Sequence, residues 1–128
     1  MIRQEVTYHN NYEIASYKEY YNDTLIEEIH YNKQGRIHGK YCKWYGNGNP
    51  SVLYNCVNGS AHGLCYNWYE NGQMESEVSY RDGKRNGKTR RWYENGQMES
   101  ETSYLDDKIT GFARGWLENG EPRWHYQH

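Results

Sequence analysis

Two copies of the segment Glu-Ser-Glu place carboxylates in pairs along the chain, and paired carboxylates can serve general acid–base catalysis. The pairs are Glu75 with Glu77 and Glu99 with Glu101. The two segments are identical, lie near arginines and come with no candidate nucleophile, so they favour solvated strand residues over a catalytic pair. We therefore expect no catalytic residue and no enzymatic activity.

Histidine and cysteine can bind metals, but in this chain they lack the paired spacing of a metal site. His38 and His62 lie one repeat apart, and the next two repeats carry other residues at that position. The sequence therefore predicts neither a metal nor a cofactor. We expect Cys42, Cys56 and Cys65 to be reduced and partly buried, although Cys56 and Cys65 flank one turn and could form a strained disulfide under oxidation.

A period of 24 residues underlies these recurrences. Each unit is marked by an aromatic residue, usually followed by an Asn-Gly pair. The two best copies, 68–87 and 92–111, share the segment WYENGQMESE. Such a period is typical of a repeat array, whose function is usually to bind other molecules. The marking residues are Tyr20, Trp44, Trp68, Trp92 and Trp116.

The repeats organise the chain as one domain without a linker. We expect a single repeat domain over residues 1–128, because the end units of repeat arrays are commonly incomplete. It consists of a half-repeat at 1–19, repeats at 20–43, 44–67, 68–91 and 92–115, and a second half-repeat at 116–128.

Each repeat contains two strand-like runs joined by turn signals, which predicts an all-β fold. An Asn-Gly pair between such runs favours a hairpin with a type I′ turn, in which both central residues have positive φ. Stacked hairpins give an elongated, single-layer antiparallel sheet of about ten strands. A slip of one residue would exchange the two faces. With Asn95-Gly96 at the tip, the expected pairs are Tyr93 with Met98, Trp92 with Glu99, Arg91 with Ser100 and Arg90 with Glu101.

Alternation along these strands distributes aromatic side chains over both faces. One face carries mainly tyrosines, and the other carries tryptophans beside glutamates. The chain has 15 tyrosines and one phenylalanine, and tyrosine suits half-buried sites where the ring packs and the hydroxyl stays in water. The first face is expected to carry Tyr69, Met74, Val78 and Tyr80, followed one repeat later by Tyr93, Met98, Thr102 and Tyr104, and the other to carry Trp68 and Trp92.

Charge and hydropathy narrow the range of partners and locations. The net charge is −2, from 15 basic and 17 acidic residues, which argues against nucleic acid and against an anionic membrane as the partner. No apolar stretch approaches the length of a membrane span, and no signal peptide is visible. Together with the cysteine usage, these features predict a cytoplasmic protein.

The repeat resembles the MORN family, and specifically its bacterial variant. The resemblance rests on WYENGQMESEVSYRDGKRNG at 68–87 and WYENGQMESETSYLDDKITG at 92–111, with degenerate copies at 20–39 and 44–63. The Gly-x-x-His-Gly endings of the degenerate copies are similar to the usual MORN turn. Bacterial proteins of this variant are commonly classed as YwqK-like antitoxins of toxin–antitoxin systems, and some relatives are thought to be immunity proteins. The resemblance therefore implies a binding protein without catalytic residues.

The tyrosine rows are the first candidate for the binding surface, because tyrosine offers large, rigid, amphipathic contact area. The alternative is that these rings only stack to hold the repeats together. The candidate residues are Tyr21, Tyr45, Tyr69 and Tyr93 in one row, and Tyr80 and Tyr104 in another, in the column of Cys56.

A basic segment, KRNGKTRR at 84–91, is the second candidate. Lys88, Arg90 and Arg91 replace uncharged residues of the preceding repeat, and Lys84 and Arg85 lie beside them. The segment could receive an acidic surface of a partner or a phosphate backbone. The alternative is that its side chains pair with Glu77, Glu99 and Glu101 on neighbouring strands.

We therefore predict a non-enzymatic module that binds another protein, a toxin or an effector, and neutralises it by steric occlusion. One alternative is a scaffold or a homodimer that forms through open sheet edges. The other is a peripheral lipid-binding protein that uses Lys84, Lys88, Arg90 and Arg91.

Overall fold

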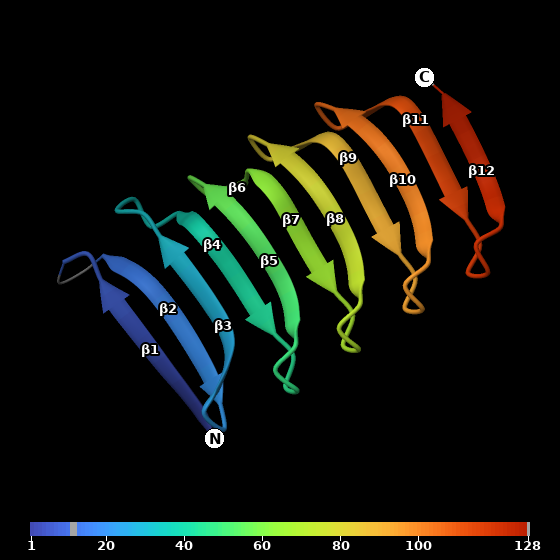
Figure 1. Ribbon diagram of the computed structural model, residues 1–128. Helices are drawn as coiled ribbons and strands as arrows, with labels where there is room; N and C mark the ends of the chain where they lie inside the picture. The colour runs from blue at the N-terminus through green and yellow to red at the C-terminus, as the bar shows by residue number, and fades with distance from the viewer. Residues whose placement is uncertain (11–12, 128) are drawn as a thin grey trace.

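A computed structural model describes residues 1–10 and 13–127, and it contains one open antiparallel sheet with the two termini at opposite ends (Figure 1). The all-β, single-layer prediction is confirmed. The described residues contain 12 strands rather than about ten, because Ile2–Tyr8 pairs with a further strand, Ile14–Tyr21, and the short strand Ser60–Ala61 pairs only with the strand before it. The strands are β1 (Ile2–Tyr8), β2 (Ile14–Tyr21), β3 (Thr24–Tyr31), β4 (Ile37–Trp44), β5 (Pro50–Val57), β6 (Ser60–Ala61), β7 (Gly63–Trp68), β8 (Met74–Arg81), β9 (Lys84–Trp92), β10 (Met98–Leu105), β11 (Lys108–Trp116) and β12 (Pro122–Gln127).

The four Asn-Gly turns that recur with the period line one long edge of the sheet, but they are not of type I′. They are Asn47-Gly48, Asn71-Gly72, Asn95-Gly96 and Asn119-Gly120. In the turn between β9 and β10, Gly96 has a φ of 87° whereas Asn95 stays outside the left-handed region. The Gly96 amide donates to the carbonyl of Tyr93 (2.9 Å), and the Tyr93 amide donates to the carbonyl of Gln97 (2.8 Å). This pattern is a three-residue loop, in which a type I turn is followed by one left-handed residue. The type I′ prediction is therefore wrong at this edge.

The type I′ pattern occurs instead at the opposite edge. Between β8 and β9, Asp82 and Gly83 have φ values of 52° and 80° and form a two-residue turn. Aspartate tolerates this conformation better than most residues, because its short polar side chain can bond locally. The Gly83 amide also donates to the carbonyl of Ala61 (2.9 Å). The turns of this edge are therefore bonded from one repeat to the next.

A β-bulge in each repeat explains the errors in the expected register. Glu99 is the extra residue of the bulge in β10. After the three-residue loop, this extra residue gives Arg91 the partner, Ser100, that a two-residue turn without a bulge would also give it. The pairs Arg91–Ser100 and Arg90–Glu101 are confirmed, whereas Tyr93–Met98 and Trp92–Glu99 are wrong, since Trp92 pairs with Met98.

The first repeat has its two turn lengths exchanged. At the Asn-Gly edge it has a two-residue turn, Asn22-Asp23, with φ values of 48° and 64°. At the other edge it has a three-residue loop, closed by a bond from the Gly35 amide to the carbonyl of Asn32 (3.0 Å). One residue is lost at one edge and gained at the other, so the period is unchanged.

A single layer cannot enclose a thick core, and the buried positions of the described residues accordingly carry small side chains. Cys65 is 1% exposed and Ala113 is 3% exposed. Large rings from neighbouring strands cover such positions, as Trp124 covers Gly115, where an added Cβ would overlap the indole. Cross-strand pairs of this kind are the main source of stability in a sheet. The other buried residues are Cys42, Val78, Ser16, Ser76, Thr89 and Thr102.

Candidate protein-binding surface

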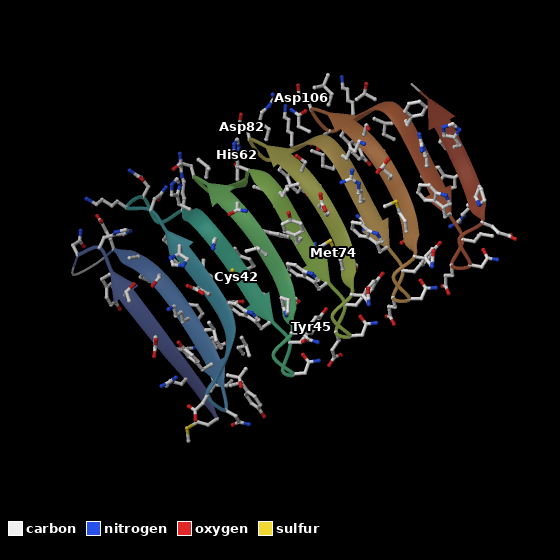
Figure 2. The ribbon with its side chains drawn as sticks, viewed as in Figure 1. Cys42, Tyr45, His62, Met74, Asp82 and Asp106 are labelled. Atoms are coloured by element: carbon white, nitrogen blue, oxygen red, sulfur yellow. The ribbon has the colours of Figure 1, made fainter. Side chains whose placement is uncertain are left out.

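The first tyrosine row lies at the Asn-Gly edge, where Tyr45 is labelled in Figure 2. Three of its hydroxyls donate to backbone carbonyls of the next repeat, and their rings are half-buried. Tyr21 precedes the shorter turn and is 51% exposed. Three of the four tyrosines in this row therefore join neighbouring repeats, which is the alternative to a binding role. The bonds run from Tyr45 to Trp68 (2.5 Å), from Tyr69 to Trp92 (2.6 Å) and from Tyr93 to Trp116 (2.7 Å).

The asparagine of each Asn-Gly turn reinforces the same edge. The Asn71 Oδ1 atom accepts from the amide of Gln73 (2.9 Å), which closes its own turn. The Asn71 Nδ2 atom donates to the carbonyl of Glu94 in the next turn (3.1 Å). Asn47 and Asn95 make the same two kinds of bond. Asparagine is thus suited to this position because it provides both an acceptor and a donor.

The second tyrosine row, Tyr80 and Tyr104, lies toward the opposite edge and is half-buried. The Arg85 guanidinium lies 4.1 Å from the centroid of the Tyr104 ring. Arg85 is held there by Asp107, whose Oδ1 atom accepts from the Arg85 Nε atom at 3.1 Å. Burial raises the pKa of the Tyr80 hydroxyl. The Tyr104 ring is thus packed against a fixed cation, and the part of both rings in binding a partner stays a prediction.

The basic segment does not form one patch. Arg90 and Arg91 are neighbours in β9, so their side chains point to opposite faces of the sheet. Arg90 donates from Nε to the Glu101 Oε2 atom (2.9 Å) and from Nη1 to the Glu77 Oε1 atom (3.4 Å). The hydrogen bond from Arg90 is the main reason why the pKa of Glu101 is lowered. Ion pairing thus accounts for Arg90, whereas Lys88 and Arg91 remain exposed.

A row of cross-strand partners containing Arg90 runs across the whole sheet, on what we call the ionic face. Charges alternate in sign from Glu5 to Glu28 and again from Glu77 to Arg114, while three central strands contribute uncharged residues. The face that carries Tyr41, Tyr54 and Tyr80 is called the tyrosine face. The row is Glu5, Lys18, Glu28, Cys42, Leu53, Tyr66, Glu77, Arg90, Glu101, Arg114 and His125.

The sequence interpretation missed this row, although a signal for it was present. Within the 24-residue frame, Cys42, Tyr66 and Arg90 occupy equivalent positions. A comparison of the charge at these positions would have shown that Cys42 and Tyr66 are uncharged where the later repeat has the cation Arg90. The complete row was hidden because the exchanged turns of the first repeat place Glu28, and not Ile29, in it.

The histidines of the Gly-x-x-His-Gly endings lie at the edge opposite the Asn-Gly turns (Figure 2, His62 with Asp82). The His38 Nδ1 atom accepts from the amide of Asn58 (3.2 Å), and the His62 Nδ1 atom accepts from the amide of Asp82 (3.4 Å). Both therefore bond to the next turn. Within residues 1–10 and 13–127, no cluster of three or more potential metal ligands occurs.

The three cysteines are free. Burial raises the pKa of the Cys42, Cys56 and Cys65 thiols. The nearby Cys56 thiol adds to the effect of burial in raising the pKa of Cys65. A raised pKa lowers the thiolate fraction and with it the reactivity of the thiol.

Stacked β-hairpins with bonded turns at both edges define a class of repeat protein, and one family of that class is recognised in the chain. The family described as MORN repeat variant matches residues 61–82 and 85–106, which cover the hairpins β7–β8 and β9–β10. These two hairpins are therefore recognised as MORN repeats of this variant. No curated protein matches it significantly.

MORN repeats are generally modules that bind proteins or lipids. In the part of the chain that the structure describes, no helix is long and apolar enough to cross a membrane.

Proposed function

We propose that this protein is a non-enzymatic binding module that neutralises a protein toxin or effector by covering its active site or substrate groove. The observation that supports this is that the residues that hold the repeats together differ from those that are available to a partner. Residues that recur with the period, such as Tyr69 and Asn71, are occupied by bonds between repeats. Residues that differ between repeats lie on the faces, where they are available to a partner.

The dimensions of the sheet suit steric occlusion. The eleven strands of the main ladder, at about 4.8 Å each, form a surface roughly 50 Å long. With most strands about eight residues or roughly 27 Å long, one face has a larger area than the about 800 Å² per partner that a standard protein interface buries. A protein partner is favoured over a lipid surface, because Arg90 and Arg91 lie on opposite faces and cannot contact one membrane together.

The test is capture with the tagged protein in a lysate of its source organism. We expect one stoichiometric protein that arrests growth when it is expressed alone in the cytoplasm and is harmless when co-expressed with this chain. A Gly48→Ala variant with weakened folding serves as the control for dependence on structure. Capture of only lipid, or of a protein that is not toxic, would reject the antitoxin proposal.

A scaffold role through an open sheet edge is the second candidate. All seven residues of β1 are exposed, among them Ile2 at 61% and Val6 at 38%. Exposed edges of this kind can pair with a strand of another chain. Sedimentation at several protein concentrations tests this role, since a monomer that persists at all concentrations would exclude it.

A further inference from the structure

The alternating charges of the ionic face are interrupted on the three neighbouring strands β4, β5 and β7. At these strands the row carries Cys42, Leu53 and Tyr66. Cys42 is buried, while Leu53 and Tyr66 are half-buried. Replacement of charges by apolar groups on an open sheet face exposes apolar area that packing within the chain does not require.

Strand β7 extends this apolar surface along its length. Leu64, Tyr66 and Trp68 alternate with residues of the tyrosine face, and the Tyr66 and Trp68 rings stack with centroids 5.7 Å apart. Leu64 is 41% exposed. The equivalent positions of β9 are Lys88, Arg90 and Trp92. The central apolar patch is defined as Cys42, Leu53, Leu64, Tyr66 and Trp68.

A carboxylate stands at each end of the interruption. Glu28 precedes the patch in the row and Glu77 follows it, and both side chains are 23% exposed. They are four strand spacings apart, or about 19 Å. Neither carboxylate has a close permanent cation to itself. Lys18 approaches Glu28 only to 4.0 Å, beside the His30 Nε2 atom at 3.0 Å, and Glu77 shares Arg90 with Glu101.

Lys40 is a cation beside the patch, and it acts on Cys42 from the same strand. It lies in the neighbouring row, opposite Asn55, and is exposed. The patch is therefore negative along the row and positive at one side. A charged partner consequently has one favoured direction of approach, with its cations placed along the row.

We propose that the central apolar patch is the docking surface for the protein partner, and that the partner inserts an apolar side chain between two cationic side chains that reach Glu28 and Glu77. This proposal rests on the protein-binding function proposed above and adds the face and the chemistry of the partner. Partly buried carboxylates favour such selection, because charge complementarity mainly determines specificity. An apolar group held in the patch supplies the buried centre typical of an interface.

The probe is a capped peptide, Lys-Gly-Leu-Phe-Leu-Gly-Lys. In an extended chain its two lysines lie about 20 Å apart, which matches the separation of the carboxylates. Its matched control has glutamate at both ends. By calorimetric titration we expect the lysine peptide to bind about tenfold more tightly than the glutamate peptide, or more, at low salt. Equal binding of the two peptides, or no binding of the lysine peptide, would overturn the proposal.

The decisive variant is Leu53→Glu with Tyr66→Arg, which continues the alternating row with the residue types found at Glu77 and Arg90. We expect it to fold, as judged by circular dichroism, and to lose binding of the lysine peptide. The matched control, Arg114→Tyr, changes the same row outside the patch and keeps binding. Should the double variant fail to fold, Leu64→Lys makes the test at an exposed position.

Neutralisation of the captured toxin separates this proposal from the function it rests on. If the wild-type protein neutralises the toxin and the Leu53→Glu/Tyr66→Arg variant does so equally well, the patch is not the docking surface and the function stands. If the wild-type protein neutralises nothing that it captures, the antitoxin function fails, and the peptide titrations still decide whether the patch selects cationic, apolar partners.

Discussion

The central strands β4, β5 and β7 and the C-terminal strands β8 to β12 share one frame but present different surfaces. At the Asn-Gly edge, Tyr45 bonds to Trp68 in the central strands as Tyr69 bonds to Trp92 in the next repeat. On the ionic face, by contrast, Tyr66 stands where β9 has Arg90. Stacking therefore depends on the edges and constrains the faces little, so that the faces can diverge without loss of the fold.

The largest expected effect comes from breaking the frame in the central strands at Gly48. Gly48 has a φ of 89° with nothing near an added Cβ, whereas Gly46, in the same turn, is equally open without a positive φ. The Gly48→Ala variant should lose about 1–2 kcal/mol of unfolding free energy, because an L-residue is strained in the left-handed region. Urea denaturation measures the loss.

Gly46→Ala is the matched control for that prediction. It should leave stability unchanged or raise it by about 0.4–1 kcal/mol, because alanine restricts the unfolded chain without strain in the folded one. Equal losses at Gly46 and Gly48 would show that the turn is sensitive to any side chain, and would remove backbone conformation as the explanation.

A smaller effect is expected from the hydroxyl that joins the central repeats to the C-terminal ones. Tyr69→Phe removes the 2.6 Å hydrogen bond to the Trp92 carbonyl and should cost about 0.5–1.5 kcal/mol. Tyr21→Phe should be close to neutral, because Tyr21 is half exposed. If both variants unfold at the same urea concentration, the hydroxyls of the tyrosine row do not stabilise the stacking of repeats, and the row is again a candidate binding surface.

Much of this frame follows from the sequence, because the frame is what repeats. The period, the all-β fold and the pairing of Arg90 with Glu101 can be predicted from the spacing of residues alone. The turn type at Asn95-Gly96 cannot, since Asn-Gly suits both the two-residue and the three-residue loop. Glu99 shows the consequence, because whether it is paired or forms a bulge depends on the turn.

The candidate site is less predictable for the opposite reason. It depends on positions at which the repeats carry different residues. Which of these residues lie side by side can be told only once the strand register is known. Leu53 and Tyr66 are 13 positions apart in the sequence and become neighbours through the pairing of β5 with β7. The basic segment at 84–91 gives the converse error, because it is contiguous in sequence and is divided between two faces in the sheet.

The ionic row of the C-terminal strands should contribute less than the edges. Arg90→Met leaves Glu77 and Glu101 without their shared cation and should cost about 0.2–1 kcal/mol, less at high salt, since the three side chains are partly solvated. Arg91→Met, on the tyrosine face and exposed, is the control and should be neutral. An Arg90→Met variant as stable as the wild type at low salt would mean that the row serves binding alone.

The smallest expected effect is a pH dependence in the C-terminal half of the row. The Arg90 hydrogen bond holds the pKa of Glu101 below its ordinary value of 4.5. Between the lowered pKa and the ordinary one, the unfolded chain binds more protons than the folded one, so the contribution of Glu101 is present above pH 4.5 and is lost as the pH falls through the lowered pKa. The stability difference between the wild type and Arg90→Met should therefore shrink as the pH falls below about 4.5.

The central strands provide the contrast for this measurement. The Leu53 side chain has no titratable group, so the stability difference between the wild type and Leu53→Ala should stay constant over the same pH range. The acid-sensitive Asp107, whose pKa is lowered chiefly by the hydrogen bond from the Arg85 amide, is present in every variant and cancels from both differences. A pH-dependent loss at Leu53 equal to that at Arg90 would place the acid response in the frame shared by all repeats, and the comparison between an ionic and an apolar part of the same face would fail.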